Sequence, residues 1–436
     1  MLPAFLAQGI ARFRTPDYLC VNSAVEMRLT PAILLVTLTL IFASQIVYAQ
    51  HYSLLIKGGR VVDPKDNIDT EMDVAIDKGR ISAIAHDINP INADKVVDAR
   101  GLYIVPGMID IHTHVFHGIK NGDNLCNGSA SAIADSFSFR SGVTTIVDAG
   151  SSGWRNFPIF KRNVIDKSKT RIYAFLNIEG FGMRGEPFEQ DTTDMDPEMA
   201  ASIAKKYRQD IVGIKIAHFE ESEWLALDSA EKAGRLASLP VMVDFGSSSR
   251  PLSLKTLCTR HLRPGDIFTH CFAEVRGRES IVDTATKKIA PYLQLARKKG
   301  IDFDVGYGKI SFDFSQALPA VHTGFYPSSI STDMQSPERG DTVKNLLNIM
   351  SRFLAMGMPL REIIASCTMN PAREIRHEEL GGIAPGTVAD LAILELEKGK
   401  FSFFDRRRQM VQGDERFRCR MTIRQGEIVY RERRSD

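Results

Sequence analysis

Two histidines end the apolar segment at residues 107–114, and their spacing suits the binding of one metal ion. The segment reads Gly-Met-Ile-Asp-Ile-His-Thr-His, which is typical of a buried β-strand. Successive side chains of a strand alternate between its faces, so His112 and His114 point the same way. Imidazole is the commonest protein ligand of divalent metals, so the pair predicts a metal site. Exposed strands also carry such pairs by chance, so the metal-site interpretation depends on other residues of the chain.

Four more metal-binding or ionisable side chains come late in apolar segments of the same kind. They are Lys215 in Ile-Lys-Ile, Asp244 in Met-Val-Asp, His270 in Phe-Thr-His and Asp333 in Ser-Thr-Asp. A strand-end aspartate can instead cap a helix, and Lys215 can instead be a structural cation with a carboxylate partner. Their recurrence at strand ends favours one shared functional site over separate structural roles.

The elements that must position these residues are alternating strands and helices. Apolar segments predict strands at residues 108–114, 143–150, 171–180, 212–217, 240–245, 266–272, 301–308 and 330–334. Helical periodicity fills several gaps between them, as at residues 222–238 and 342–356. Eight such units predict an α/β fold of the (β/α)8 or TIM-barrel type, whose chemistry lies at the C-terminal ends of the strands. All six candidate residues fall at that end.

Short β segments at both ends of the chain predict a second, smaller domain. They lie at residues 54–62, 73–76 and 80–84, and again at 389–394, 417–424 and 427–430. Neither set is large enough to bury a core alone, so we expect both to pack into one β-sandwich. The expected organisation is a leader at residues 1–49, sandwich parts at 50–106 and 379–436, and a barrel at 107–378.

The overall composition is that of a globular protein with ample core. The chain has 436 residues, 44% hydrophobic and 25% charged, with a net charge of +2. This balance gives no reason to expect nucleic acid as a partner, and we expect the arginines at 406–408 to form a solvated face. The chain has six cysteines without a CxxC motif, one of them in the leader, so we expect no disulfide framework.

Residues 30–49 have the pattern of an export signal. Arg28 precedes an apolar core at residues 32–43, and Val-Tyr-Ala at 47–49 suits cleavage before Gln50. The apolar core is shorter than the ~20 residues of a membrane span. We therefore expect a signal peptide at 27–49, preceded by an over-extended gene start, and a periplasmic or secreted mature chain without membrane contact. An uncleaved leader acting as a membrane anchor is the alternative.

Three motifs give the chain a family resemblance. Residues 105–114 read VPGMIDIHTH, residues 368–373 read TMNPAR, and residues 386–394 read GTVADLAIL. With these motifs in this order, residues 52–430 resemble the amidohydrolase superfamily, and within it the deacetylase group near dihydroorotase and D-aminoacylase. The resemblance implies a centre of two divalent metals, usually zinc, at the mouth of the barrel.

The resemblance also implies roles for the candidate residues. His112, His114 and Asp333 would hold the first ion and His270 the second, while Lys215, carboxylated by CO₂, would bridge them. An ammonium cannot bind a cation, whereas a carbamate is an anion with two oxygens.

One position departs from the family's commoner pattern. Where most relatives have a strand-five histidine, this chain has Asp244, which we expect to be a metal ligand. A carboxylate weakens the Lewis acidity of the metals and favours Mn²⁺ alongside Zn²⁺, and the centre could then hold one ion or two. His218 is a reserve ligand, but strand alternation from Lys215 predicts that it faces away from the site.

The expected activity is hydrolysis of a carbon–nitrogen amide bond, as in an N-acyl amino acid or a cyclic amide, by a metal-activated water. Asp333 would accept the proton of the water and give it to the leaving group. An acetyl ester as substrate, or a deaminase activity, is the alternative, although deaminases of this type commonly lack the bridging lysine. A non-catalytic binding protein is least expected, because such members have lost the ligands.

Loop residues after the strands are candidate contacts of a small-molecule substrate. Arg155, Arg184, Arg276 and Lys309 could each bind a substrate carboxylate, although each can equally be a surface charge. Tyr307 could donate a hydrogen bond to the scissile oxygen or could simply pack. Barrels of this kind often pair, so a homo-oligomer is an expected state.

Overall fold

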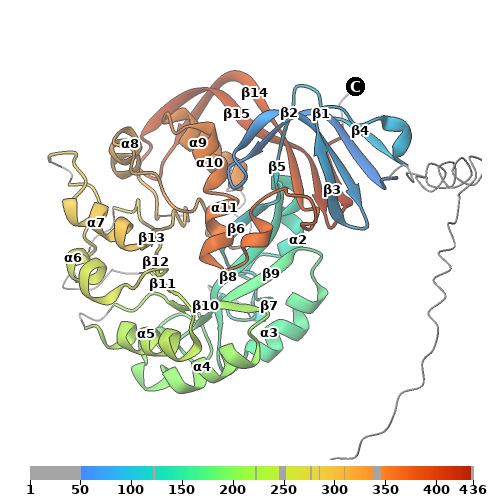
Figure 1. Cartoon of the computed structure of the whole chain (residues 1–436). Coiled ribbons are helices and arrows are strands. Elements are labelled where there is room, and N and C mark those ends of the chain that lie inside the picture. Colours follow the sequence, from blue (N-terminus) through green and yellow to red (C-terminus); the bar gives the residue numbers. More distant parts are fainter. Residues whose placement is uncertain are drawn as a thin grey trace, which may run out of the picture. The chain divides into compact units, whose positions relative to one another are not determined.

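The computed structural model of the chain (Figure 1) describes residues 51–120, 124–220, 223–244, 252–274, 277–283, 285–308, 310–336 and 345–433. The predicted leader and two predicted substrate contacts, Arg276 and Lys309, lie outside these residues. No helix in the described ranges is both long enough and apolar enough to cross a membrane.

A seven-stranded sheet with parallel pairing forms most of the barrel. Its order is β13-β12-β11-β10-β9-β8-β6. The strands are β6 (Met108–Thr113), β8 (Val143–Gly153), β9 (Arg171–Asn177), β10 (Ile211–Ile216), β11 (Val241–Val243), β12 (Ile267–Phe268) and β13 (Asp302–Phe303). Each overlaps a segment that the sequence predicts, although the last three are shorter than predicted.

Residues 329–334 close the sheet between its two edges. On one side the backbone N–H of Tyr307 donates to the carbonyl of Ser331 at 3.1 Å. On the other side the N–H of Asp333 donates to the carbonyl of His112, and that of His114 to Met334, both at 2.7 Å. This segment takes the position of the predicted eighth strand, so the predicted (β/α)8 barrel is confirmed.

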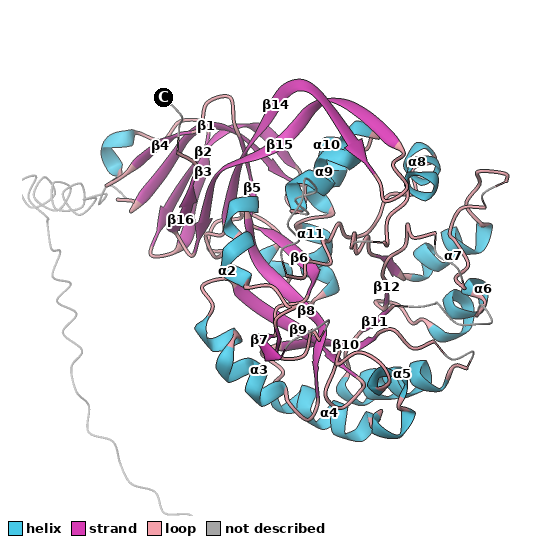
Figure 2. Ribbon diagram, turned by 180° about the vertical axis from the view of Figure 1, so that it is seen from behind, coloured by secondary structure: helices cyan, strands magenta, loops and turns pink. Residues whose placement is uncertain are grey.

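Helices cover the outside of the barrel sheet (Figure 2). They are α2 (Ala134–Phe137), α3 (Phe157–Asn163), α4 (Pro197–Lys206), α5 (Leu225–Ala237), α6 (Leu254–Thr256), α7 (Pro291–Lys299), α8 (Phe314–His322), α9 (Leu346–Ala355), α10 (Leu360–Ala365) and α11 (Met369–Glu374). The two predicted helices correspond to α5 and α9. The side chain of Asn345 caps α9 by accepting a hydrogen bond from the N–H of Asn348, which fixes where that helix begins.

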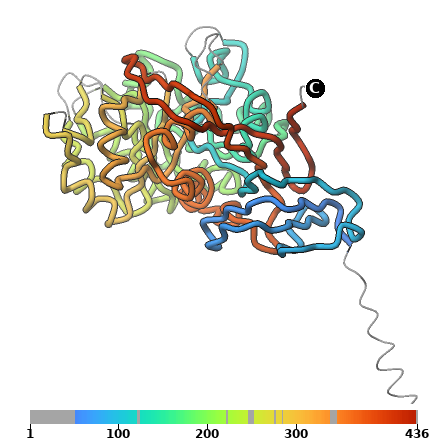
Figure 3. Tube along the Cα trace, turned by 90° about the horizontal axis from the view of Figure 1, so that it is seen from above, coloured from blue at the N-terminus to red at the C-terminus, as the bar shows by residue number. Residues whose placement is uncertain are grey.

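Strands from both ends of the chain pair in one second sheet, seen from above in Figure 3. Its order is β16-β15-β14-β5-β1-β2-β3, with β4 also paired to β1. The strands are β1 (Leu54–Asp63), β2 (Ile68–Asp77), β3 (Arg80–Ala85), β4 (Val96–Asp98), β5 (Tyr103–Pro106), β14 (Leu391–Phe404), β15 (Met410–Arg424) and β16 (Glu427–Arg431). The short β7 (His117–Lys120) lies outside both sheets. The predicted joining of both chain ends in a small β domain is confirmed.

Asp390 joins the small domain to the barrel. Its carbonyl accepts a hydrogen bond from the N–H of Gly107 at 2.8 Å, directly before β6. Its carboxylate forms an ion pair with Arg171 at the start of β9 and accepts the N–H of Gln425 at 2.7 Å. Asp390 is 4% exposed, so these contacts are shielded from water. The five cysteines of the described part are buried and free.

Candidate metal centre

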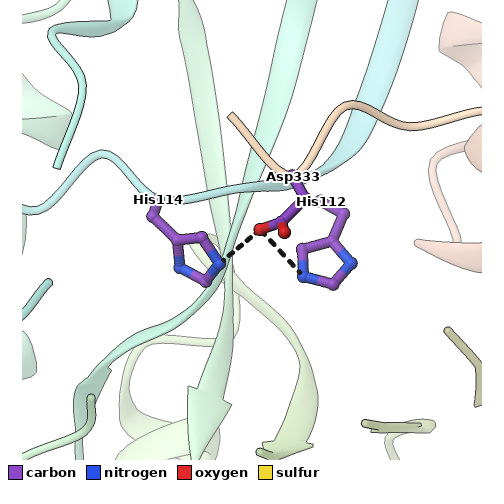
Figure 4. Close-up of side chains that lie close together, drawn as sticks. All are labelled: His112, His114 and Asp333. Atoms are coloured by element: carbon purple, nitrogen blue, oxygen red, sulfur yellow. Dashed lines mark ion pairs between the residues drawn. The ribbon is translucent and has the colours of Figure 1, made fainter. Parts of the chain in front are cut away.

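His112, His114 and Asp333 meet at the C-terminal end of the barrel strands. Figure 4 shows both imidazoles directed toward the carboxylate of Asp333. Nε2 of His114 lies 3.0 Å from Oδ1 of Asp333, and Nε2 of His112 lies 3.7 Å from the same oxygen. Both histidines are 1% exposed. The ligand atoms lie within 4.8 Å of one another, which suits the binding of one divalent ion.

The second ring nitrogen of each histidine has its own partner. Nδ1 of His112 lies 2.8 Å from Oγ1 of Thr269 and 3.3 Å from Oδ2 of Asp304. Nδ1 of His114 lies 3.1 Å from Oγ of Ser151. Such partners fix the ring orientation of metal-binding histidines and leave Nε2 free for the ion. The donor set therefore fits a divalent metal.

Lys215 is fully buried beside this cluster. Its Nζ lies 3.4 Å from Nε2 of His112. Burial lowers the pKa of the ammonium, although Asp244 and Asp333 oppose that shift. Among the residues that the structure describes, no carboxylate lies within ion-pair distance of Lys215. A buried ammonium without such a partner is costly, so the structural-cation interpretation loses its support.

Asp244 and His270 form a second pair next to the first cluster. Nε2 of His270 lies 3.3 Å from Oδ2 of Asp244, and the ring centroids of His270 and His112 lie 4.9 Å apart. Nδ1 of His270 lies 2.6 Å from the carbonyl oxygen of Gly306, which makes Nδ1 the protonated nitrogen. Burial opposes ionisation of Asp244, but His270 and Lys215 outweigh it and hold its pKa well below the ordinary range.

The backbone around these groups is unusual. His270 and Asp333 have φ of +53° and +52°, a left-handed conformation that is uncommon for non-glycine residues. A Cβ on Gly306 would come within 2.6 Å of Nδ1 of His270, and one on Gly308 within 2.4 Å of Oδ2 of Asp333. A Cβ on Gly150 would meet Cγ of Lys215 at 2.6 Å. The site is therefore lined by backbone at these three positions.

His218 lies nearer to the site than its sequence spacing predicts. β10 ends at Ile216, and His218 has a φ of +56°, so strand alternation no longer governs its direction. Its Nε2 lies 3.9 Å from Oδ2 of Asp244, and its Nδ1 lies 2.7 Å from Oε2 of Glu189. The prediction that His218 faces away from the site was wrong.

Three further residues of the site carry charges that the sequence analysis missed. Asp304 reaches His112, Glu189 reaches His218, and Nη1 of the buried Arg278 lies 3.7 Å from Oδ1 of Asp244. Asp304 had a detectable signal, because it is a charged residue inside the apolar segment Ile-Asp-Phe-Asp-Val. Glu189 and Arg278 lie in connecting segments where nothing in the local sequence distinguishes them.

The two predicted arginine contacts that the structure describes already have carboxylate partners. Nε of Arg155 donates to Oδ1 of Asp194 at 2.9 Å, and Nη2 of Arg184 donates to Oε1 of Glu179 at 2.6 Å. Both guanidinium groups therefore form ion pairs within the protein.

Tyr307 is 6% exposed and belongs to the barrel's hydrophobic core. Its ring lies 4.9 Å from the guanidinium carbon of Arg352 and 5.0 Å from the ring of Phe312. These contacts correspond to the packing role that the sequence analysis left open.

Comparison with known proteins extends the resemblance. Residues 326–430 match the sequence model described as Amidohydrolase family. A deacetylase from Brucella anthropi is 32% identical over 340 residues, which cover 76% of this chain and 81% of the relative. The crystal structure of an adenine deaminase is similar with a TM-score of 0.78 at 28% identity, covering 87% of this chain and all of that one. A dihydroorotase structure has a TM-score of 0.75 at 27% identity, covering 86% and 98% of the two chains.

Proposed function

Because this chain belongs to the amidohydrolase family, a family of hydrolases that act on carbon–nitrogen bonds, we propose that it removes the acyl group of a small N-acyl compound. The observation that carries this proposal is the convergence of His112, His114 and Asp333 on one point. The similarity to a deacetylase over most of the chain favours an acyl amide over a purine as the substrate. The similarity to a dihydroorotase structure makes a cyclic amide the second candidate.

His112, His114 and Asp333 would hold one divalent ion, for which we propose zinc with manganese as the alternative. When bound, the ion would polarise the scissile carbonyl and lower the pKa of water. The hydrogen bonds from both Nδ1 atoms keep the two imidazoles in the orientation that binding needs.

Asp333 is the proposed general base and acid. Its Oδ1 is next to both imidazoles, whereas its Oδ2 is next to Gly308, so one oxygen stays available for proton transfer. Burial raises the pKa of Asp333, but the lowering effect of His114 and His270 is larger. The net pKa lies below its ordinary value, so the carboxylate is ionised at neutral pH. It would take a proton from the attacking water and give it to the leaving nitrogen, which must be protonated to leave as an amine.

We propose that Lys215 is carboxylated. The neutral amine would form a bond to the carbon of CO₂ and release one proton, giving a carbamate anion with two oxygens. The complete burial of Lys215, its position 3.4 Å from His112 and the lack of a carboxylate partner among the described residues support this modification.

The proposal is tested with purified protein on a panel of N-acyl amino acids, cyclic amides, acetyl esters and adenine. We expect turnover of at least one amide, lost after chelation and restored by zinc or manganese. Release of ammonia from adenine alone would instead indicate a deaminase. Absence of both bound metal and turnover would favour a binding protein on the same scaffold.

We also propose that the chain is exported, with the segment at residues 30–49 as the supporting feature. N-terminal sequencing of the protein recovered from its cells tests this. A mature chain that begins near Gln50 is expected, and retention of the leader in a membrane fraction would indicate an anchor.

A further inference from the structure

One oxygen of Asp244 faces two histidines from different parts of the chain. Oδ2 of Asp244 lies 3.3 Å from Nε2 of His270 and 3.9 Å from Nε2 of His218. The other oxygen, Oδ1, faces the guanidinium of Arg278 at 3.7 Å. The carboxylate is therefore turned so that a single oxygen meets both imidazoles. One carboxylate oxygen and two imidazole nitrogens are a common donor set for zinc.

Glu189 holds His218 in this orientation. The Glu189 side chain is 4% exposed, its Oε2 lies 2.7 Å from Nδ1 of His218, and its Oε1 accepts the N–H of Gly185 at 2.6 Å. A carboxylate at Nδ1 holds a ring proton there, so Nε2 is the nitrogen that faces Asp244. Burial lowers the pKa of His218, but Glu189 and Asp244 raise it to about 9, so a bound ion would displace the proton of Nε2. Metal-binding histidines commonly have this carboxylate partner, which fixes the tautomer and makes the ligand nitrogen more basic.

His270 has the same arrangement with a different acceptor. Its Nδ1 contacts the carbonyl oxygen of Gly306 at 2.6 Å, and its Nε2 also faces Asp244. The side chain of His218 is 51% exposed, so an ion arriving from solvent can reach it. Both imidazoles thus direct Nε2 toward one carboxylate, while Glu189 and the carbonyl of Gly306 hold their Nδ1 atoms.

We infer that His218 is a ligand of a second divalent ion, held together with Asp244 and His270, and that Glu189 is the residue that positions it. The inference rests on the proposed function, because it adds an ion next to the one at His112, His114 and Asp333. The competing account is an ion pair in which His218 only bridges Glu189 and Asp244 and contacts no metal.

The test counts zinc in the full chain. Asp228, Glu231 and His261 lie close enough to hold an unrelated ion on the outer face, so every protein carries His261→Ala as its background. Each protein is loaded with zinc, desalted and analysed for metal per chain, and the affinity of each ion is measured by competition with a chromogenic chelator. We expect two ions per chain in the background protein. In His218→Ala we expect one ion per chain after desalting, because the second ion should bind at least tenfold more weakly than in the background protein.

Two further variants sharpen the test. Glu189→Gln keeps the His218 ligand but loses its anionic partner, so we expect two ions at saturation and a tenfold to hundredfold weaker second ion. His86→Ala removes an exposed histidine next to β3, in the small domain, and should change neither count nor affinity. Retention of the first ion in His218→Ala shows that the variant is folded.

The outcomes separate this inference from the proposed function. Two ions of unchanged affinity in His218→Ala would overturn the inference and support the ion-pair account. One ion in the background protein, with turnover, would also overturn it while the proposed function stands. No ion and no turnover in that protein would remove both. If His218→Ala does not fold, the affinity of Glu189→Gln decides.

Discussion

Oδ2 of Asp304 lies 3.3 Å from Nδ1 of His112, behind the imidazole whose other nitrogen faces Asp333. The same carboxylate accepts hydrogen bonds from the hydroxyls of Thr269, Ser329 and Ser331 at 2.6–2.9 Å. Asp304 is fully buried, and burial raises its pKa although these hydroxyls oppose the shift. A buried carboxylate with so many donors is a rigid support for the ligand histidine.

Replacing this support should weaken the first ion. In Asp304→Asn we expect the zinc affinity to fall tenfold to a hundredfold. The neutral amide fixes the tautomer of His112 less strongly than the carboxylate does and makes its ligand nitrogen less basic. Chelator competition measures the change. Asp302→Asn is the matched control, since Asp302 lies two residues earlier and pairs with Arg373 at 2.6 Å instead of a histidine. Equal zinc affinity in Asp304→Asn and the unmodified protein would contradict the supporting role.

Asp333→Asn should separate catalysis from folding. The amide cannot accept the water proton, so we expect kcat to fall by about a hundredfold or more. The thermal transition should stay close to that of the unmodified protein, because the amide is nearly isosteric with the carboxylate. Metal analysis of the same sample shows whether lost zinc contributes to the lower rate. Activity like that of the unmodified protein would exclude Asp333 as the proton carrier.

Carboxylation of Lys215 predicts a dependence on CO₂. Metal-free protein reloaded with zinc in bicarbonate-containing buffer should regain activity faster than in CO₂-free buffer, because the carbamate must form before it can bind the ions. Protein reloaded with ¹³C-labelled bicarbonate should also show one carbamate carbon by NMR. Lys215→Ala should give no such signal. Full reactivation in CO₂-free buffer without a carbamate signal would leave Lys215 as an unmodified amine.

Asp390 should matter for stability more than for chemistry. Asp390→Ala leaves Arg171 and the N–H of Gln425 without their partner in a shielded position. We expect a loss of about 3–5 kcal/mol in the free energy of unfolding, measured by urea denaturation. Arg416→Ala, which breaks an exposed pair with Glu397, should cost about 1 kcal/mol or less. Similar losses in both variants would mean that the Asp390 contacts are no stronger than a surface pair.

The barrel and the six strand-end residues could be predicted because simple rules apply inside strands. Alternation predicts that His112, in β6, and His114, directly after it, face the same way, and parallel strands bring their C-terminal ends to one edge. The same rules failed for His218. It lies beyond the end of β10 with a left-handed backbone, and the segment Ile-Lys-Ile-Ala-His contains no residue that predicts a turn there.

Glu189 illustrates a second limit. Its contact with His218 joins the connection after β9 to the end of β10, and it depends on how those two segments fold against each other. Tyr307 illustrates the reverse case. Its position after strand seven was compatible with the site, but its side chain packs in the core against Phe312 and Arg352.

The pairing of β5 with β14 has a consequence for the order in which the protein can fold during synthesis. Ile104 pairs with Ile393, so the edge of β5 stays open until nearly the whole chain has left the ribosome. Contacts between segments so distant in sequence form late in folding. Until then the unpaired edge of β5 can pair with strands of other chains. A chain shortened before Leu391 would keep its barrel strands and site residues, yet it would expose this edge permanently.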